Sequence, residues 1–532
     1  MIRLYDSLTQ AKVDFISRDA GKAGIYCCGP TVYGLVHVGN ARPYVTFAVL
    51  RSWLRRRDYD VTLVENITDV DDKIIARANE EGRTAAEVAR EFTDAYHEDV
   101  GRLGDALRPD IEPLATETIP EIIDLCSRLV ASGHAYEAEG SVYFRVRSFP
   151  GYGKLSRQRI EELEEGARVE GEPGKEDPLD FAIWKAAKPG EPAWESPWGM
   201  GRPGWHIECS AMGLRYLGPG FDIHGGGRDL IFPHHENEIA QSEAAGLPFA
   251  RVWMHNGMIH FGGEKMAKSV GNIFLLREVL DRYAPAVVLT YFLTTHYRSP
   301  LEFSLEKLDE ARAAYDRLAE AVRTASFRID HPGAGEALLA DDLRAAAKAA
   351  KDAFAAHMDD DLNTAAALGE LFALARRLFR HVAAADAAGK AVDADALEEA
   401  QDVIVDGLDA LLIGLPDRVV TTTVGAHLPS VAVEGVPASG EAAGAAGERV
   451  CTTESVTLPS AARLAREGRW DDLGLLYRER LACGDASYAC ALRDHLRAMK
   501  DWASADRVRD AIQAAGFEVR DTKQGTQVVP RD

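Results

Sequence analysis

Ala23-Gly24-Ile25-Tyr26-Cys27-Cys28-Gly29-Pro30 is a short apolar run that ends at a Gly-Pro pair. Such a run predicts a buried strand followed by a loop. Residues 42–57 then have apolar side chains at helical spacing, residues 60–67 predict a second strand, and another helix begins at Asp71. This strand–helix–strand order predicts a parallel sheet with right-handed crossovers, which binds ligands at the carboxyl ends of its strands.

The rest of the chain divides into segments of different composition. We predict an α/β fold in which a doubly wound, Rossmann-like parallel sheet is split by an insertion and followed by a helical bundle and a small α+β C-terminal domain. Residues 253–259 predict a late strand of the sheet domain. The last domain should contain a helix over residues 502–514 and a hairpin across Gly525. The predicted segments are 1–108 and 201–255 for the two halves of the catalytic domain, 109–200 for the insertion, 256–303 for a signature-loop and stem-contact region, 304–415 for the bundle, 416–450 for a flexible linker, and 451–532 for the C-terminal domain.

The composition is that of an ordinary globular protein, with 46% hydrophobic and 27% charged residues among 532. No apolar run is long enough to cross a bilayer, and the first fifteen residues do not resemble a signal peptide. Seven cysteines, an odd number, predict reduced thiols and a cytoplasmic location. The net charge of -23 argues mildly against a nucleic-acid partner. Two local clusters of arginines, within residues 51–57 and 463–480, are compatible with a nucleic-acid partner. On charge alone, a solvated helix face explains them at least as well.

Four residues far apart in the sequence form the ligand set of a zinc ion, namely Cys28, Cys209, His234 and Glu238. His234 and Glu238 are four positions apart, so on a helix they project from the same face. Each residue taken singly has a simpler explanation, as a core thiol or an ordinary helix-surface pair. A closed structural zinc site is a further alternative, because four protein ligands satisfy tetrahedral zinc.

Several long motifs together resemble the cysteinyl-tRNA synthetase family of class I aminoacyl-tRNA synthetases. The resemblance covers nearly the whole chain and fades over residues 417–488. The motifs that carry it are Cys27 to Tyr33, Asn66 to Ile74, Gly204 to Ser210, His224 to Glu238, Trp253 to Gly257, Lys265 to Ser269, Met358 to Thr364 and Trp502 to Asp510.

Two short stretches correspond to the ATP signatures of class I enzymes. The first is His37-Val38-Gly39-Asn40, at the start of a helix, where backbone N–H groups and the helix dipole face phosphates. The resemblance implies that His37 and Asn40 are catalytic and that Gly39 lets adenine approach the backbone. The usual last residue is His; Asn40 can donate a hydrogen bond but cannot be cationic.

The second signature is Lys265-Met266-Ala267-Lys268-Ser269, in which Ala267 replaces the usual Ser. The resemblance implies that both lysines clamp the β- and γ-phosphates of ATP. Taken alone, a His-x-Gly turn is more often structural, and a Lys-x-x-Lys loop is usually a solvated basic patch.

The resemblance also implies a pocket for the amino acid. It assigns Gly29, Thr68, Trp205 and His224 to this pocket, and Asp229 to a ribose hydroxyl or the substrate ammonium. Structural roles in capping, core packing or a turn are the alternatives. Zinc prefers a thiolate to a hydroxyl, whereas pocket size alone discriminates by only about 1–3 kcal/mol. The metal is therefore expected to select the substrate thiol.

The expected function is the ATP-dependent ligation of L-cysteine to tRNA(Cys) through a cysteinyl-adenylate. It implies one Zn²⁺ per chain, ATP with Mg²⁺, a monomeric state and no membrane partner. One alternative is a related ligase that joins cysteine to an amino sugar in thiol biosynthesis, but such relatives lack a long anticodon-binding region. A second alternative is a synthetase-like paralogue that binds tRNA or cysteine without charging. The departures from the signatures at Asn40 and Ala267 support it, whereas the presence of both phosphate-binding lysines argues against it.

Overall fold

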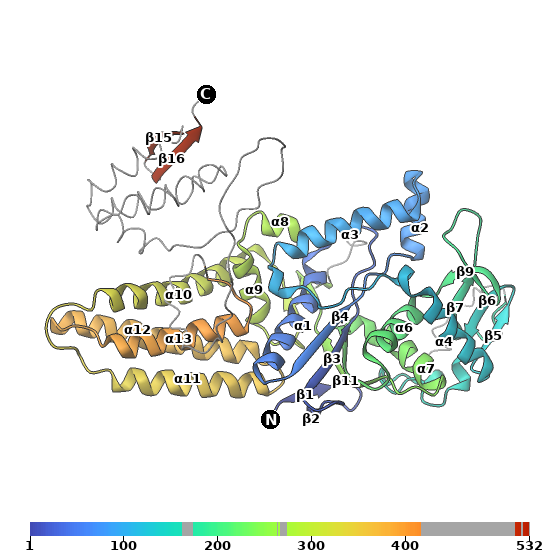
Figure 1. Cartoon of the computed structure of the whole chain (residues 1–532), viewed down its shortest axis with the longest axis horizontal. Helices are drawn as coiled ribbons and strands as arrows, with labels where there is room; N and C mark the ends of the chain where they lie inside the picture. The colour runs from blue at the N-terminus through green and yellow to red at the C-terminus, as the bar shows by residue number, and fades with distance from the viewer. Residues whose placement is uncertain (162–173, 263, 266–273, 416–516, 523–524, 531–532) are drawn as a thin grey trace, which may run out of the picture. The chain divides into compact units, whose positions relative to one another are not determined.

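The computed structural model describes residues 1–161, 174–262, 264–265, 274–415, 517–522 and 525–530 (Figure 1). The chain forms two compact units, Met1–Leu415 and Pro416–Asp532. The first contains the catalytic sheet, the insertion and the helical bundle. None of the helices in the described ranges has the length and apolar character that a membrane crossing requires.

A four-stranded parallel sheet forms the centre of the first unit, as the sequence predicts. Its strand order is β11-β10-β3-β4, with every neighbouring pair parallel. The strands are β3 (Lys22–Cys27), β4 (Asp60–Glu65), β10 (Phe221–Gly227) and β11 (Ala250–Asn256). A short hairpin, β1 (Arg3–Asp6) with β2 (Ala11–Asp14), lies beside β11. Helices cover this sheet, so most residues of its strands are buried, as in other parallel sheets.

Helix α1 (Val38–Arg56) begins four residues before the predicted start at residue 42. The backbone N–H of His37 donates to Asn40 Oδ1 at 3.1 Å, which helps to close the helix start. Val45, Val49 and Leu50 are fully buried between α1 and the rest of the core. The first signature therefore forms the N-terminus of the helix that packs on the sheet.

The insertion is a separate five-stranded antiparallel sheet of order β5-β6-β7-β9-β8. Helix α4 (Ile119–Ala131) packs on it around a core that includes Trp184 and Phe144. The last strand extends to Pro203, slightly beyond the predicted boundary at residue 200. The strands are β5 (Ala135–Ala138), β6 (Ser141–Phe144), β7 (Phe181–Ala186), β8 (Trp194–Ser196) and β9 (Gly199–Pro203).

The predicted late strand over residues 253–259 is wrong as a single element. Strand β11 ends at Asn256, and β12 (Ile259–Phe261) begins a second sheet with β13 (Glu264–Lys265) and β14 (Leu301–Glu302). The break occurs where Arg42 of α1 binds the carbonyl oxygens of Gly257 and Met258, at 2.7 and 3.2 Å. Helices α8 (Leu276–Leu280) and α9 (Pro285–Leu293) follow.

Four long helices form the bundle predicted for residues 304–415. They are α10 (Leu305–Asp330), α11 (Asp341–Asp359), α12 (Thr364–Ala388) and α13 (Ala394–Ala410). In the second unit, β15 (Phe517–Thr522) and β16 (Gly525–Pro530) form the predicted antiparallel hairpin. The predicted linker 416–450 and the predicted helix 502–514 lie outside the described residues.

Candidate functional site

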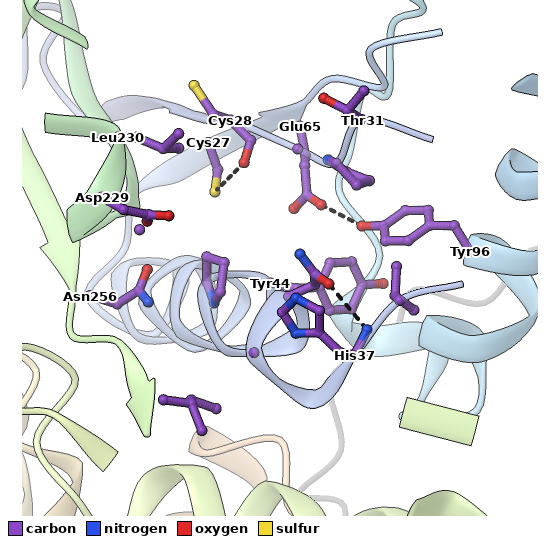
Figure 2. Close-up of a pocket in the computed structure, with 18 of the residues that line it drawn as sticks. Cys27, Cys28, Thr31, His37, Tyr44, Glu65, Tyr96, Asp229, Leu230 and Asn256 are labelled. Atoms are coloured by element: carbon purple, nitrogen blue, oxygen red, sulfur yellow. Dashed lines mark hydrogen bonds between the residues drawn. The ribbon is translucent and has the colours of Figure 1, made fainter. Parts of the chain in front are cut away.

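A cavity of about 460 Å³ opens at the carboxyl ends of β3, β4, β10 and β11 (Figure 2). This is the position that the parallel sheet predicts for a ligand. Most of the predicted site residues that the structure describes line this cavity. They are Cys28, Gly29, His37, Gly39, Asn40, Trp205 and Asp229.

Two loops that leave neighbouring strands run side by side at the cavity. Gly29 follows β3, and a side chain there would meet the carbonyl oxygen of Asn66 at 1.8 Å. The amide side chain of Asn66 accepts a hydrogen bond from the Gly29 N–H at 3.1 Å, and Thr68 pairs with Thr31. Glycine is therefore required at position 29 by the close approach of the second loop.

The first ATP signature is bonded to the segment that follows the second. Val38 N–H donates to the Phe274 carbonyl, and Leu276 N–H donates to the Val36 carbonyl, both at 3.0 Å. At Gly39 an added side chain would meet the His37 ring at 2.8 Å, so glycine at this position leaves room for the His37 imidazole. The Lys265 side chain and Lys268 lie outside the described parts of the structure.

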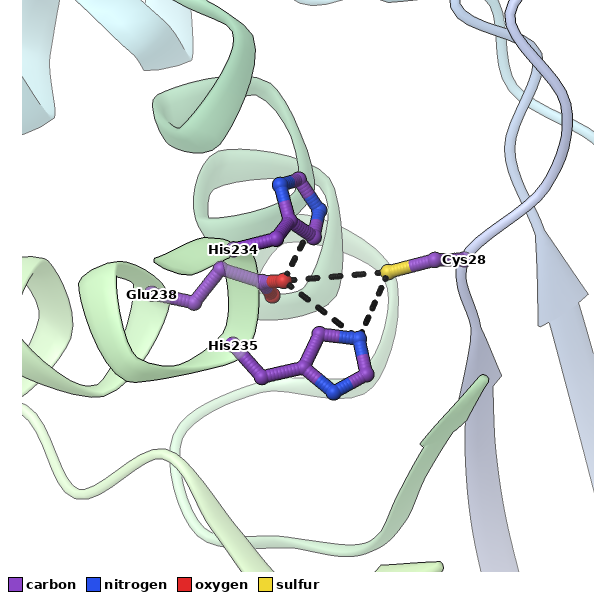
Figure 3. A group of neighbouring side chains, drawn as sticks. All are labelled: Cys28, His234, His235 and Glu238. Atoms are coloured by element: carbon purple, nitrogen blue, oxygen red, sulfur yellow. Dashed lines mark hydrogen bonds and ion pairs between the residues drawn. The ribbon is translucent and has the colours of Figure 1, made fainter. Parts of the chain in front are cut away.

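A cluster of buried metal-ligating side chains lies beside the cavity, which one of them, Cys28, lines. Figure 3 shows the four side chains of this cluster. The ligand atoms of Cys28, His234, His235 and Glu238 all lie within 4.8 Å of one another. Glu238 Oε1 lies 3.0 Å from His234 Nε2 and 3.7 Å from Cys28 Sγ. Cys28 follows β3, whereas the other three come from the turn η5 (Ile231–His235) and helix α7 (Glu236–Ala244).

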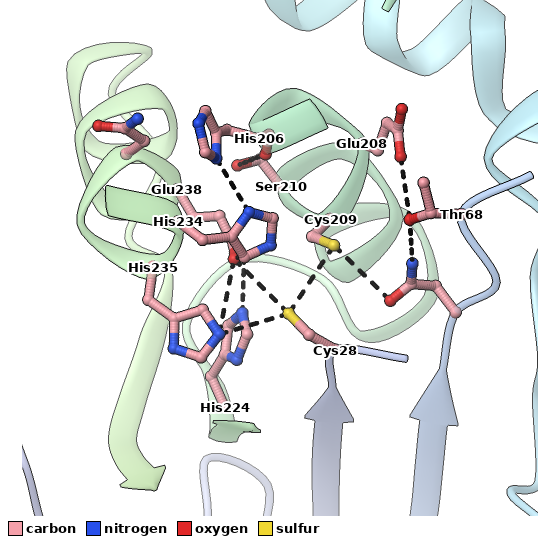
Figure 4. A network of polar contacts seen from close by, with 12 residues as sticks. Cys28, Thr68, His206, Glu208, Cys209, Ser210, His224, His234, His235 and Glu238 are labelled. Carbon is pink, nitrogen blue, oxygen red and sulfur yellow. Dashed lines mark hydrogen bonds and ion pairs between the residues drawn. The ribbon is translucent and has the colours of Figure 1, made fainter. Parts of the chain in front are cut away.

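Cys209 adds a second thiol from helix α6 (Trp205–Leu217). Its Sγ lies 3.8 Å from Cys28 Sγ (Figure 4). Two thiolates on tetrahedral zinc, each about 2.3 Å from the ion, lie about 3.8 Å apart, so this pair of sulfurs fits zinc. All four predicted ligands therefore lie together. His235 joins them unpredicted, although the His234-His235 doublet was a visible indication.

Burial sets the protonation of these groups. It raises the pKa of the Cys28 thiol, with a further contribution from Cys209, and it raises the pKa of the Glu238 carboxyl. It lowers the pKa of His234 and His235. The protein alone therefore favours a neutral donor set. A divalent cation reverses the preference of the thiols and the carboxyl, because it stabilises their anions.

Other buried side chains orient the ligand residues. His206 Nδ1 lies 2.9 Å from His234 Nδ1, and His255 Nε2 lies 2.8 Å from His235 Nδ1. His224 Nε2 lies 2.6 Å from Glu238 Oε2. Each contact fixes a ring or carboxylate from the side away from the donor cluster, as supporting groups do at metal sites.

The predicted amino-acid pocket residues occupy two kinds of position. Trp205 is partly exposed in the cavity, and its ring stacks on His234 with a centroid distance of 4.3 Å. Thr68 and His224 are buried behind the cavity wall. The Thr68 hydroxyl donates to Glu208 Oε2 at 3.2 Å, and His224 stacks on Trp253.

The glycine run 225–227 would allow a close approach of the backbone to a ligand, but at Gly225 a helix approaches instead. A side chain at this position would meet the Phe47 ring of α1 at 1.9 Å. Gly225 therefore lets α1 pack against the sheet, whereas Gly226 and Gly227 face Leu230 and Asp229.

Glu65, Tyr44 and Tyr96 also line the cavity and have no role in the sequence-based prediction. Tyr96 donates to Glu65 at 2.5 Å in the cavity wall (Figure 2). The available indication was a carboxylate at the last position of a buried strand, where ligands meet a parallel sheet.

Comparison with protein families gives two matches along this chain. Residues 15–313 match the class I (C) tRNA synthetase catalytic domain, and residues 353–408 match the DALR domain. A cysteine–tRNA ligase of Pelotomaculum thermopropionicum is 44% identical over 99% of both chains. One of Carboxydothermus hydrogenoformans is 52% identical over 70% of this chain and 80% of its own.

Solved structures of other synthetases share the fold at low identity. Methionyl-tRNA synthetase of Mycobacterium tuberculosis, in complex with methionyl-adenylate, aligns with a TM-score of 0.54 at 17% identity and covers 74% of this chain and 90% of its own. A leucyl-tRNA synthetase of Agrobacterium radiobacter aligns with a TM-score of 0.55 at 11% identity, covering 75% and 84%. The parallel sheet and its helices are thus those of class I synthetases.

Proposed function

Because this chain belongs to the cysteine–tRNA ligases, a family of class I aminoacyl-tRNA synthetases, we propose that it charges tRNA(Cys) in two steps at the cavity. The carboxylate of L-cysteine attacks the α-phosphate of ATP, which forms cysteinyl-adenylate and releases pyrophosphate. A ribose hydroxyl of the terminal adenosine then attacks the acyl carbon and releases AMP. No protein side chain forms a covalent bond, so catalysis rests on positioning and charge stabilisation.

The N-terminus of α1 receives the nucleotide in this proposal. Its backbone N–H groups and dipole favour phosphate, and His37 and Asn40 add side-chain donors. Gly39 lines the cavity and has no side chain, so adenine can approach the backbone there. Lys265 and Lys268 bind the β- and γ-phosphates together with Mg²⁺. The bonds between the 36–38 and 274–276 segments support this role, because they tie the start of α1 to the chain that follows the lysines.

Cys28, Cys209, His234 and Glu238 would hold a zinc ion, which would supply a preference for the substrate thiolate over a serine hydroxyl. These four residues therefore give the enzyme its choice of amino acid. Gly29 and Trp205 border the amino acid, with Trp205 as the apolar wall. Thr68 and His224 are buried behind this wall and reach the amino acid when side chains move on binding, with the Thr68 hydroxyl as the partner of the ammonium group. Asp229 binds a ribose hydroxyl or the substrate ammonium.

The remaining segments bind the tRNA. The helical bundle, which contains the DALR match, and the segment 451–532 contact the tRNA body and anticodon, with 416–450 as a linker. We further propose that the protein is a cytoplasmic monomer.

The observation that carries the proposal is a zinc-type donor cluster beside a cavity whose wall also holds the ATP signature. The test is cysteine-dependent exchange of pyrophosphate into ATP, followed by aminoacylation of tRNA. Cys209→Ser should lose zinc and most cysteine binding. Cys126→Ser is the matched control, because Cys126 is equally buried but belongs to the core of the insertion. Unchanged cysteine affinity in the Cys209 variant would contradict the zinc role.

A further inference from the structure

The cavity wall contains a carboxyl group to which the proposed function gives no role. Glu65 is the last residue of β4 and lies opposite Cys27, the last residue of β3. Its side chain is only 3% exposed, yet it lines the same cavity as His37 and Asn40. A carboxyl group at this place needs partners, because burial removes its water.

Glu65 has a partner on one oxygen only. The Tyr96 hydroxyl of helix α3 (Ala85–Gly101) donates to Oε1 at 2.5 Å (Figure 2). Oε2 is buried and has no hydrogen-bond partner among the residues that the structure describes, and the same holds for the hydroxyl of Tyr44. Buried polar atoms are rarely left unpaired, so two such atoms in one cavity wall point to a ligand that completes them.

The surroundings of Glu65 favour its neutral form. The pKa of the Glu65 carboxyl is raised to about 8, because burial and the nearby Glu112 raise it more than the Tyr96 hydrogen bond and Arg51 lower it. Arg51 is engaged with the carbonyl oxygen of Ala106 and with Asp110 at 3.4 Å. The titratable groups around this carboxyl come from four parts of the chain, namely Cys27 of β3, Tyr44 and Arg51 of α1, Tyr96 of α3, and Arg108 and Glu112 of the segment after α3.

The N-terminus of α1, which also lines the cavity, indicates the nature of the ligand. The N-terminus of α1 is the place for the phosphates of ATP, and an ionised carboxylate in the same cavity would repel them. A protonated carboxyl instead donates a hydrogen bond through Oε2. Asn40 cannot carry a positive charge, and its Oδ1 already accepts from the His37 N–H, so the cavity gains from a further donor.

Resting on the proposed function, we propose that Glu65 is a substrate-binding residue whose protonated carboxyl donates to a phosphate oxygen of ATP during amino-acid activation. Tyr96 holds the carboxyl in place through Oε1, and Oε2 carries the donated proton throughout. The proton stays on Glu65, so the residue stabilises charge and does not act as an acid or base.

Glu65→Gln tests this role because glutamine has the same size, remains a donor and does not titrate. Cysteine-dependent pyrophosphate exchange is measured from about pH 7 to about pH 9 for both enzymes. We expect a wild-type to Glu65→Gln ratio near one at about pH 7 and a fall of about tenfold by about pH 9, as the wild-type carboxyl ionises through about 8. The loss should fall on the ATP-dependent parameters and leave the KM for cysteine unchanged.

Two further variants sharpen the result. Tyr96→Phe removes a hydrogen bond that lowers the pKa of Glu65, so the alkaline loss should move to higher pH. Glu65→Ala should reduce exchange by about tenfold to a hundredfold at about pH 7, because a phosphate oxygen loses a donor. Melting curves show which variants fold. If Glu65→Ala does not fold, the ratio of wild-type to Glu65→Gln exchange activity still decides the test.

Two results would overturn the role of Glu65. One is a loss of more than about tenfold in Glu65→Gln at about pH 7, which would mean that an ionised carboxylate is needed. The other is a wild-type to Glu65→Gln ratio that does not change with pH. A wild-type enzyme without cysteine-dependent exchange would instead contradict the proposed function itself.

Discussion

At the scale of residues, His234 and His235 both lie in the donor cluster, but a tetrahedral zinc with Cys28, Cys209 and Glu238 needs only one of them. His234 Nε2 is 3.0 Å from Glu238 Oε1, whereas His235 Nε2 is 3.9 Å from it and 3.4 Å from Cys28 Sγ. Each ring is held by another histidine on its far side. The shorter distance to Glu238 favours His234 as the zinc ligand and leaves His235 a supporting role.

Alanine substitutions separate the two histidines. His234→Ala should retain much less than one zinc per chain after dialysis, because a ligand is lost. His235→Ala should keep one zinc, with affinity reduced by about 10- to 100-fold at most, as is usual for supporting residues. The measurement is zinc content by elemental analysis, with circular dichroism to verify folding. The opposite pattern would make His235 the ligand.

Residue types explain which site residues the sequence could reveal. Cys28, Cys209, His234 and Glu238 could be found because zinc accepts few kinds of ligand, and the structure brings all four together. Glu65 could not be found in this way. Its importance depends on an oxygen left without a partner, which requires the positions of side chains on α1 and α3.

At the scale of elements, Arg42 connects α1 to two loops beneath the cavity. It is 1% exposed and donates to four backbone carbonyls. The guanidinium nitrogens of Arg42 lie 2.7 Å from the carbonyl oxygens of Gly257 and Ser299. They lie 3.2 Å from the carbonyl oxygen of Met258 and 3.3 Å from that of His296. Gly257 and Met258 also line the cavity, so this arginine holds part of its wall against the helix that carries the ATP signature.

Arg42→Met keeps most of the side-chain volume and removes these hydrogen bonds. The free energy of unfolding should fall by about 2–4 kcal/mol, because buried carbonyl oxygens lose their donors. Arg56→Met is the control on the same helix, where a largely exposed ion pair with Asp409 is worth about 0–1 kcal/mol. Urea unfolding measures both. Equal losses in the two variants would contradict the structural role of Arg42.

Element boundaries show where sequence patterns are insufficient. The apolar spacing of α1 places its start at residue 42, but the structure begins the helix at Val38 because Asn40 bonds back to His37. The apolar run at 253–259 contains two strands, since Arg42 binds the carbonyls between them. Both errors come from side-chain hydrogen bonds, which periodicity does not encode.

At the scale of the whole molecule, the described site residues belong entirely to the unit Met1–Leu415. A chain ending at Leu415 should therefore retain cysteine-dependent pyrophosphate exchange, within about twofold of the full chain. Aminoacylation of tRNA should fall strongly, because the proposed anticodon contacts lie beyond residue 450. Both assays on one preparation provide the comparison. Undiminished aminoacylation would contradict the tRNA-binding role of the second unit.

The central claim is that a zinc ion recognises the thiol of the substrate. Cobalt(II) replaces zinc in such sites and absorbs light through bonds to sulfur, so the measurement is the absorption spectrum of the cobalt-substituted enzyme during titration with L-cysteine. We expect a stronger sulfur-to-metal band that saturates with cysteine and is unchanged by L-serine, since the new ligand is a thiolate. A spectrum that does not change while cysteine supports pyrophosphate exchange would contradict it.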